Sequence, residues 1–107
     1  MLFNFFKSVP SISTKELEGL LTRKTQLIDV RTPAEYQRGH VRFSQNIPLN
    51  RIPSFKPRQS EDPIYVMCQS GARSSRASRM LQKQGYNVVN VRGGMSQWTG
   101  PINGGKN

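Results

Sequence analysis

Cysteine and histidine are almost absent from this chain of 107 residues, which contains one of each, Cys68 and His40. A single cysteine excludes a disulfide within the chain. One cysteine and one histidine cannot supply the ligands of a structural zinc site, so we expect no metal site. A free thiol is typical of the reducing cytoplasm, and we expect a cytoplasmic protein.

Long hydrophobic runs are also missing, and no apolar stretch approaches the roughly 20 residues of a membrane-spanning helix. The apolar segment of residues 1–6 is interrupted by Asn4, follows no basic residue and precedes no small-residue cleavage site, so it is a poor signal peptide. We expect an N-terminal tail over residues 1–11, or a strand there that packs on the domain, and no membrane contact. The length predicts one domain, over residues 12–100, followed by a C-terminal tail over residues 101–107.

Acidic side chains are scarce and unevenly distributed. The formal net charge is +10, from 16 Lys and Arg against 6 Asp and Glu, and no Asp or Glu follows Asp62. The half of the chain that carries the cysteine is therefore uniformly basic and should attract small anions, although a solvated surface would show the same excess. Arg76, Arg79 and Lys83 form only a short stripe, without a row of exposed aromatic residues, so nucleic-acid binding is not expected.

Two segments carry the signature of a helix start, in which a Ser or Thr cap is followed three residues later by Glu. Residues 13–16 predict such a start for a helix that reaches about Leu21. Residues 32–35, with Pro33 in the first helical position, predict a second helix that ends at Gly39.

Three runs rich in Ile, Val, Leu and Tyr predict buried strands, at residues 26–30, 63–67 and 86–91. Residues 46–49 predict a further, brief strand. Residues 50–63 hold three prolines and several charges, which predicts a loop with one helical turn.

Apolar residues recur at helical spacing from Ser74, Gly85 ends that helix, and a last helical piece carries Met95 and Trp98. Strands that alternate with helices predict an α/β fold with a parallel sheet covered on both faces. Ligands of such sheets bind beyond the carboxyl ends of the strands. Cys68 directly follows a strand expected at the centre of the sheet, so it stands where a site is expected.

The segment from Cys68 to Ser75, CQSGARSS, joins that strand to the next helix. A lone cysteine is most often buried and inert, and that alternative would hold for a cysteine in the middle of a strand. Here the following helix points its unpaired N–H groups at the loop, which lowers the pKa of a thiol, and the neighbouring Arg73 lowers it further. Cys68 is therefore the candidate nucleophile.

The same loop has donors for an anion. Gly71 can adopt positive φ, and a tight loop of this kind can turn successive N–H groups inward. Ser70 and Ser74 add hydroxyl groups, and Arg73 can bind a doubly charged oxyanion through two parallel hydrogen bonds. We expect His40, at the end of a helix, to be structural, and we do not assign it as a catalytic base.

Several motifs, taken in their order and spacing, resemble a single-domain rhodanese, a thiosulfate sulfurtransferase, over most of the chain. They are LIDVR at 27–31, EY at 35–36, GHV at 39–41, NIP at 46–48, CQSGARS at 68–74, RGG at 92–94 and Trp98. The chain departs from the family at Phe43-Ser44, where its members often have Gly-Ala.

This resemblance implies a rhodanese-like three-layer α/β domain, with a central, mostly parallel five-stranded sheet and helices on both faces. It implies that Cys68 is the catalytic nucleophile, which carries a sulfane sulfur as a persulfide without a metal or organic cofactor. The residues that bind the substrate would be Gln69, Ser70, Gly71, Ala72, Arg73 and Ser74. Asp29, Arg31 and Glu35 resemble the family's residues near the site, and we interpret them as a structural ion-pair network.

The resemblance further implies a small anionic donor such as thiosulfate, with cyanide or a thiol as acceptor. A relay of sulfur between proteins, or a non-catalytic module that binds a partner, would have the same sequence. Related phosphatases and arsenate reductases have a loop one residue longer. The four residues between Cys68 and Arg73 favour the sulfurtransferase, and no carboxylate after Asp62 could serve a phosphatase as general acid.

Overall fold

The computed structural model describes residues 8–58 and 60–104. The apolar segment of residues 1–6 lies outside the described residues, so its packing stays a prediction. Within the described ranges, no helix combines the length and the hydrophobicity that crossing a bilayer requires.

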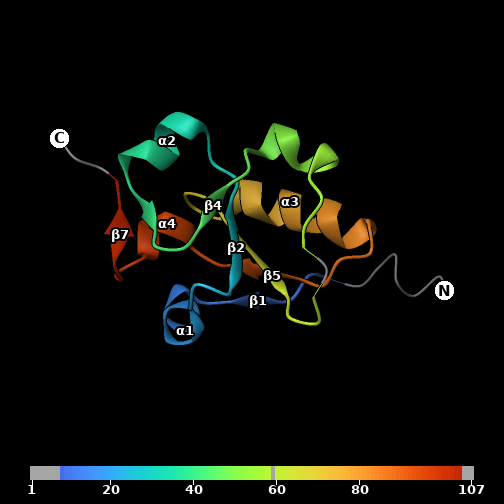
Figure 1. The fold of residues 1–107 in the computed structure, drawn as a ribbon, viewed down its shortest axis with the longest axis horizontal. Coiled ribbons are helices and arrows are strands. Elements are labelled where there is room, and N and C mark those ends of the chain that lie inside the picture. Colours follow the sequence, from blue (N-terminus) through green and yellow to red (C-terminus); the bar gives the residue numbers. More distant parts are fainter. Residues whose placement is uncertain (1–7, 59, 105–107) are drawn as a thin grey trace.

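Five short strands form a central parallel sheet (Figure 1). They are β1 (Ser11–Ile12), β2 (Gln26–Asp29), β4 (Gln45–Asn46), β5 (Ile64–Met67) and β6 (Val88–Val91). Their order across the sheet is β1-β6-β5-β2-β4, and every neighbouring pair is parallel. The predicted parallel α/β sheet is confirmed, and β5, which leads into Cys68, is its central strand.

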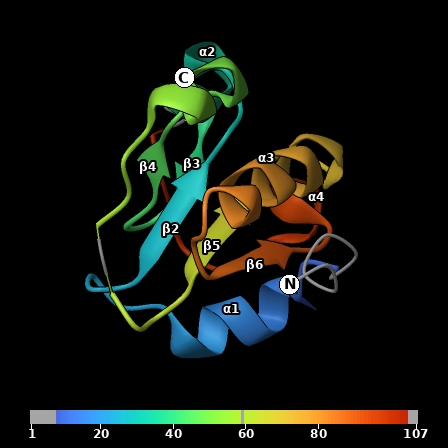
Figure 2. The same cartoon turned by 90° about the vertical axis from the view of Figure 1, so that its right-hand side faces the viewer.

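Helices cover both faces of this sheet, as Figures 1 and 2 show. On one face lies α1 (Thr14–Leu20), with the short α4 (Gly94–Gln97) beside it, where the side chain of Thr14 donates a hydrogen bond to the carbonyl of Gln97 at 3.1 Å. On the other face lie α3 (Ala72–Lys83) and the 3₁₀ helix η2 (Leu49–Ser54). The predicted three layers are thus confirmed, with α2 (Pro33–Arg38) following β2 at one end.

Side chains of β5 alternate between two hydrophobic cores, as the period of a strand requires. Ile64 and Val66 pack on the α3 side, where Leu81 is fully buried. Met67 packs on the opposite side with Leu17 of α1. The strand is covered on both faces, which is why its sequence reads as a nearly continuous apolar run.

Both predicted capping boxes are present. The Ser13 hydroxyl accepts from the N–H of Glu16 at 3.0 Å, and the Glu16 carboxylate accepts from the N–H of Ser13 at 2.9 Å. Thr32 and Glu35 form the same reciprocal pair, at 3.2 and 2.9 Å. Each box satisfies two N–H groups that a helix start otherwise leaves unpaired.

Besides shifts of one or two residues at the ends of β2, β5 and β6, three predicted boundaries differ from the structure. The brief strand ends at Asn46, and Leu49 begins η2 instead. The helix after the cysteine begins at Ala72, two residues before Ser74, because Gly71 takes a left-handed conformation and caps it.

The third difference concerns the C-terminal tail. Ile102 and Asn103, predicted as part of a tail from residue 101, form a two-residue strand, β7. It pairs antiparallel with β3 (His40–Val41), which satisfies backbone groups that a tail would leave to water. A strand of two residues beside Pro101 and Gly104 has no period that the sequence could reveal.

Phe43 occupies the point where the chain departs from the family pattern, and its backbone is left-handed, with φ of 72°. It is the one non-glycine residue with positive φ among the described residues. A side chain in this conformation costs roughly 1–2 kcal/mol. Phe43 thus adopts a backbone conformation that glycine adopts without strain.

We expect Leu81→Ala to lower the free energy of unfolding by about 2–5 kcal/mol, because it empties a fully buried site. The matched change Leu20→Ala, at a side chain that is 39% exposed, should stay within about 0.5 kcal/mol. Urea unfolding midpoints at an unchanged slope measure both. Equal losses would contradict this assignment of the core.

Candidate active site

Cys68 lies at the carboxyl end of the central strand and is 1% exposed. The loop that follows is three residues long, and α3 starts at Ala72. Among the residues predicted to bind substrate, Gln69, Ser70 and Ala72 are exposed and Ser74 is buried. The thiol is therefore at the inner end of the loop, beneath the exposed residues.

Two backbone N–H groups and one hydroxyl group surround the sulfur. The N–H groups of Gly71 and Ser74 donate to Cys68 Sγ at 3.1 and 3.3 Å. The Cys68 thiol donates to Ser74 Oγ at 3.4 Å, and the Ser74 hydroxyl donates to the Gly71 carbonyl at 3.1 Å. When the thiol is ionised, this hydroxyl can turn its proton to the sulfur.

Opposing effects act on the thiol, and those that favour the thiolate are stronger. Burial raises the pKa of Cys68, because it disfavours the charged form. Hydrogen bonds from the Ser74 hydroxyl and from the N–H groups of Ser74, Gly71 and Ser70 lower it more, so the pKa lies below its ordinary value. The predicted activation of the thiol by a helix start rests on these groups.

Arg73, predicted to bind an oxyanion of the substrate, binds a carboxylate of the protein in this structure. Its Nη1 and Nη2 donate to the two carboxylate oxygens of Glu35 at 2.7 and 3.0 Å, and these are the two parallel bonds predicted for a bound oxyanion. This pair, with the Thr32 bonds, lowers the pKa of Glu35 to about 2, and Glu35 raises the pKa of Arg73. The thiolate of Cys68 raises the Arg73 pKa by a smaller amount, so the two groups attract one another.

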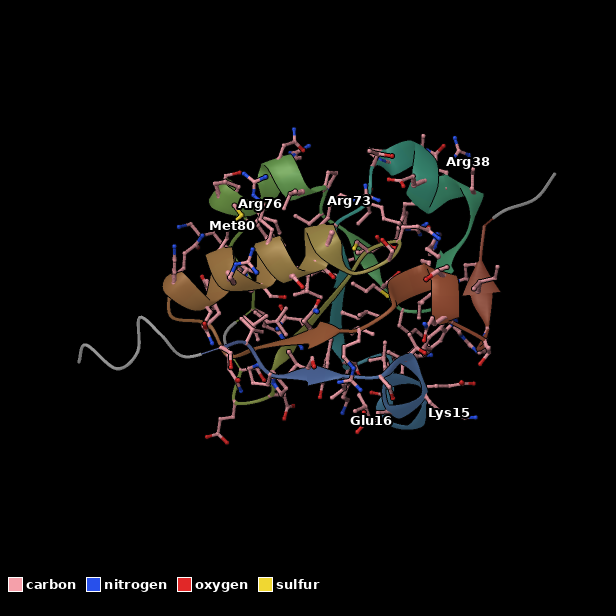
Figure 3. The ribbon with its side chains drawn as sticks, turned by 180° about the vertical axis from the view of Figure 1, so that it is seen from behind. Lys15, Glu16, Arg38, Arg73, Arg76 and Met80 are labelled. Carbon is pink, nitrogen blue, oxygen red and sulfur yellow. The ribbon has the colours of Figure 1, made fainter. Side chains whose placement is uncertain are left out.

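The Arg73–Glu35 pair joins the start of α3 to α2 across one end of the sheet, and Figure 3 places Arg73 at the end of α3 that faces α2. The two side chains are 35% and 26% exposed. A half-buried, bidentate pair of this kind fixes geometry better than a single exposed bond.

Asp29 and Arg31 form a second ion pair, which is buried beside the loop. Arg31 Nη2 lies 2.9 Å from Asp29 Oδ2 and also donates to the Gly39 carbonyl at 2.8 Å. Its Nη1 donates to the side-chain oxygen of Gln69 at 3.4 Å. The pair thus links the end of β2 to Gly39, which directly follows α2, and to Gln69 of the active-site loop. Such links are expected of a structural network.

His40 belongs to neither group. Its ring stacks on Tyr36 with centroids 3.7 Å apart, and its Nδ1 lies 2.7 Å from the Tyr36 carbonyl. These contacts agree with the structural role predicted for it.

Gly94 packs closely against the backbone of the active-site loop, and the sequence did not reveal this role. The N–H groups of Met95 and Ser96 donate to the carbonyls of Cys68 and Gln69, each at 2.9 Å. A Cβ atom on Gly94 would lie 2.1 Å from the Cys68 carbonyl oxygen, so only glycine allows this approach. Two adjacent glycines at 93–94 are typical of a turn, but their spacing does not indicate which backbone the turn approaches.

Comparison with known proteins agrees with this fold. The family description "Rhodanese-like domain" matches residues 13–101. The chain belongs to the rhodanese-like domain family.

Its relatives include proteins named for sulfur chemistry. The chain is 40% identical over 82 residues to a protein named sulfurtransferase from Allochromatium vinosum, covering 72% of this chain and 74% of that protein. It is 42% identical over 82 residues to the uncharacterized protein YqhL of Bacillus subtilis and 37% identical over 97 residues to the putative sulfur carrier protein YrkF of the same species. These matches cover 75% and 87% of this chain but only 65% and 52% of those two proteins.

A solved structure shows the same architecture. The crystal structure of a rhodanese-like domain protein from Staphylococcus aureus matches with a TM-score of 0.78 and 32% identity, covering 90% of this chain and 98% of that one. The family match and this neighbour together show the rhodanese-like fold of the domain.

We expect Gly94→Ala to destabilise the fold by about 2 kcal/mol or more, because the added methyl group must displace the Cys68 carbonyl or α4. Gly19→Ala is the matched control, since a Cβ there meets nothing within 4 Å and Gly19 lies in a helix, where alanine is favoured. Thermal unfolding compares the two. Similar melting temperatures for both variants would contradict the close approach at Gly94.

We expect Ser74→Ala to raise the pKa of Cys68, because it removes a donor to the thiolate. The midpoint of the pH dependence of thiol alkylation should move to higher pH. Ser70→Ala should leave the midpoint in place, since Ser70 acts through its peptide N–H. A midpoint unmoved by Ser74→Ala would mean that the backbone alone sets the pKa.

Proposed function

We propose that this protein is a sulfurtransferase that carries a sulfane sulfur as a persulfide on Cys68. The observation that carries the proposal is the convergence of the Gly71 and Ser74 N–H groups on Cys68 Sγ, at 3.1 and 3.3 Å, with the Ser74 hydroxyl 3.4 Å from the sulfur. A thiolate is the nucleophile in sulfur chemistry, and these donors favour it over the thiol. The outer sulfur of a persulfide is also anionic, and the exposed loop residues Gln69, Ser70 and Ala72 would surround it.

The reaction we propose is a double displacement. The Cys68 thiolate attacks the outer sulfur of a sulfane donor such as thiosulfate. The new S–S bond forms as the bond to the sulfonyl sulfur breaks, and sulfite leaves with the electron pair. Cyanide then attacks the outer sulfur of the persulfide, forms thiocyanate and releases the thiolate. No metal or organic cofactor takes part in these steps.

Two alternatives use the same site. In the first, the protein takes part in a relay, in which a protein persulfide is the donor or a protein thiol is the acceptor. The relative named as a putative sulfur carrier supports this alternative. A phosphatase of the same fold is less well supported, because the arginine of its loop would have to bind phosphate, whereas Arg73 binds Glu35. We place the reaction in the reducing cytoplasm, where a single thiol persists.

We expect incubation with thiosulfate to add about 32 Da, one sulfur, to the intact protein, and cyanide to remove it. Peptide mapping should place the added sulfur on Cys68, and Cys68→Ser should gain no mass under the same conditions. An unmodified wild-type protein whose Cys68 still reacts with an alkylating agent would reject thiosulfate as donor and favour a protein donor. Mass gain in the Cys68→Ser variant would contradict the assigned nucleophile.

A further inference from the structure

Arg31 and Arg73 beside the active-site loop are each paired with a carboxylate, although the chain as a whole has a large positive charge. Both terminal nitrogens of Arg73 bind Glu35, at 2.7 and 3.0 Å. Arg31 is buried against Asp29 and is 4% exposed. The loop residues between Cys68 and Arg73 are uncharged. A donor that approaches the sulfur therefore meets N–H groups and two neutralised pairs.

This pairing matters most for a donor with two charges. A guanidinium that binds no carboxylate offers a dianion a full positive charge and two parallel N–H bonds. With Glu35 attached, the net charge of the pair is zero, and the carboxylate repels the donor from the same position. The pairing of Arg73 with Glu35 therefore removes less electrostatic attraction from a donor with one charge than from a dianion.

We propose that Glu35 determines donor selectivity by occupying Arg73, so that the site disfavours dianionic sulfane donors relative to singly charged ones. This inference rests on the proposed sulfur transfer and names the class of donor that the site selects. Glu35 acts through Arg73 and is a positioning residue. In the catalysed step, the persulfide forms in the same way from either donor, and the leaving group is sulfite from thiosulfate or a sulfinate from a thiosulfonate.

The experiment compares thiosulfate, a dianion, with methanethiosulfonate, which carries one negative charge and transfers the same outer sulfur. Thiocyanate formation with cyanide gives kcat/KM for each donor. In Glu35→Gln, we expect the ratio of the thiosulfate value to the methanethiosulfonate value to rise about fivefold, because one more donor charge faces an unpaired Arg73. Glutamine also fits a capping box, so the start of α2 keeps its cap.

Glu16→Gln is the matched control. Glu16 occupies the same position in the other capping box, and its removal changes the net charge equally. Figure 3 shows it on α1, on the side of the molecule opposite Arg73. Because exposed charges at this separation are screened by salt, we expect this variant to change the ratio by less than about twofold.

A double variant tests whether the effect passes through Arg73. In Glu35→Gln with Arg73→Gln, we expect the ratio to return to the wild-type value or below it. An unchanged or lower ratio in Glu35→Gln would overturn the inference, as would an equal rise in Glu16→Gln or a rise that persists in the double variant. A purely structural role of Glu35 would lower both kcat/KM values together.

Failure of the proposed function would look different. Wild-type protein that forms no Cys68 persulfide from either donor would overturn sulfur transfer from small donors, and the selectivity inference would fall with it. Turnover of both donors with a ratio that Glu35 does not influence would leave the sulfurtransferase intact and overturn only the selectivity.

Discussion

The hydrogen bonds that converge on Cys68 Sγ constrain the rest of the site. Burial alone would raise the pKa of the thiol, and the donors from Gly71 and Ser74 reverse that effect. Their position depends on the left-handed Gly71, which starts α3 directly after the loop, and on α4, whose N–H groups hold the loop carbonyls from behind. A buried sulfur and a lowered pKa coexist because the Ser74 hydroxyl and these backbone groups are already directed at the sulfur.

Much of the fold could be predicted from the sequence, because its signals are local. The capping boxes at Ser13 and Thr32 and the apolar run of β5 each depend on neighbouring residues, and all are present in the structure. The pairing of β7 with β3 joins residues about sixty positions apart through backbone groups alone. Nothing in side-chain type marks such a pairing.

In the site too, features with local sequence signals could be predicted, and contacts between distant segments could not. Cys68 and its loop follow from their place between a strand and a helix, which the sequence reveals. The partner of Arg73 does not, because Glu35 lies on another helix and its distance depends on how α2 and α3 meet. Gly94 is similar, since the need for glycine arises from the carbonyl of Cys68, which the fold brings against it. Contacts between distant segments decide what these residues do.

The order of the strands has a consequence for how the chain acquires its reactivity. β1, the first strand, has β6 as its neighbour in the sheet, and β6 precedes α4 by only two residues. During synthesis, β1 therefore cannot pair until β6 has been made. Pairing between segments so far apart in the sequence slows folding. The loop carbonyls gain their α4 partners at the same late stage. A nascent or unfolded chain carries an ordinary thiol, and the activated one forms only when the domain is complete.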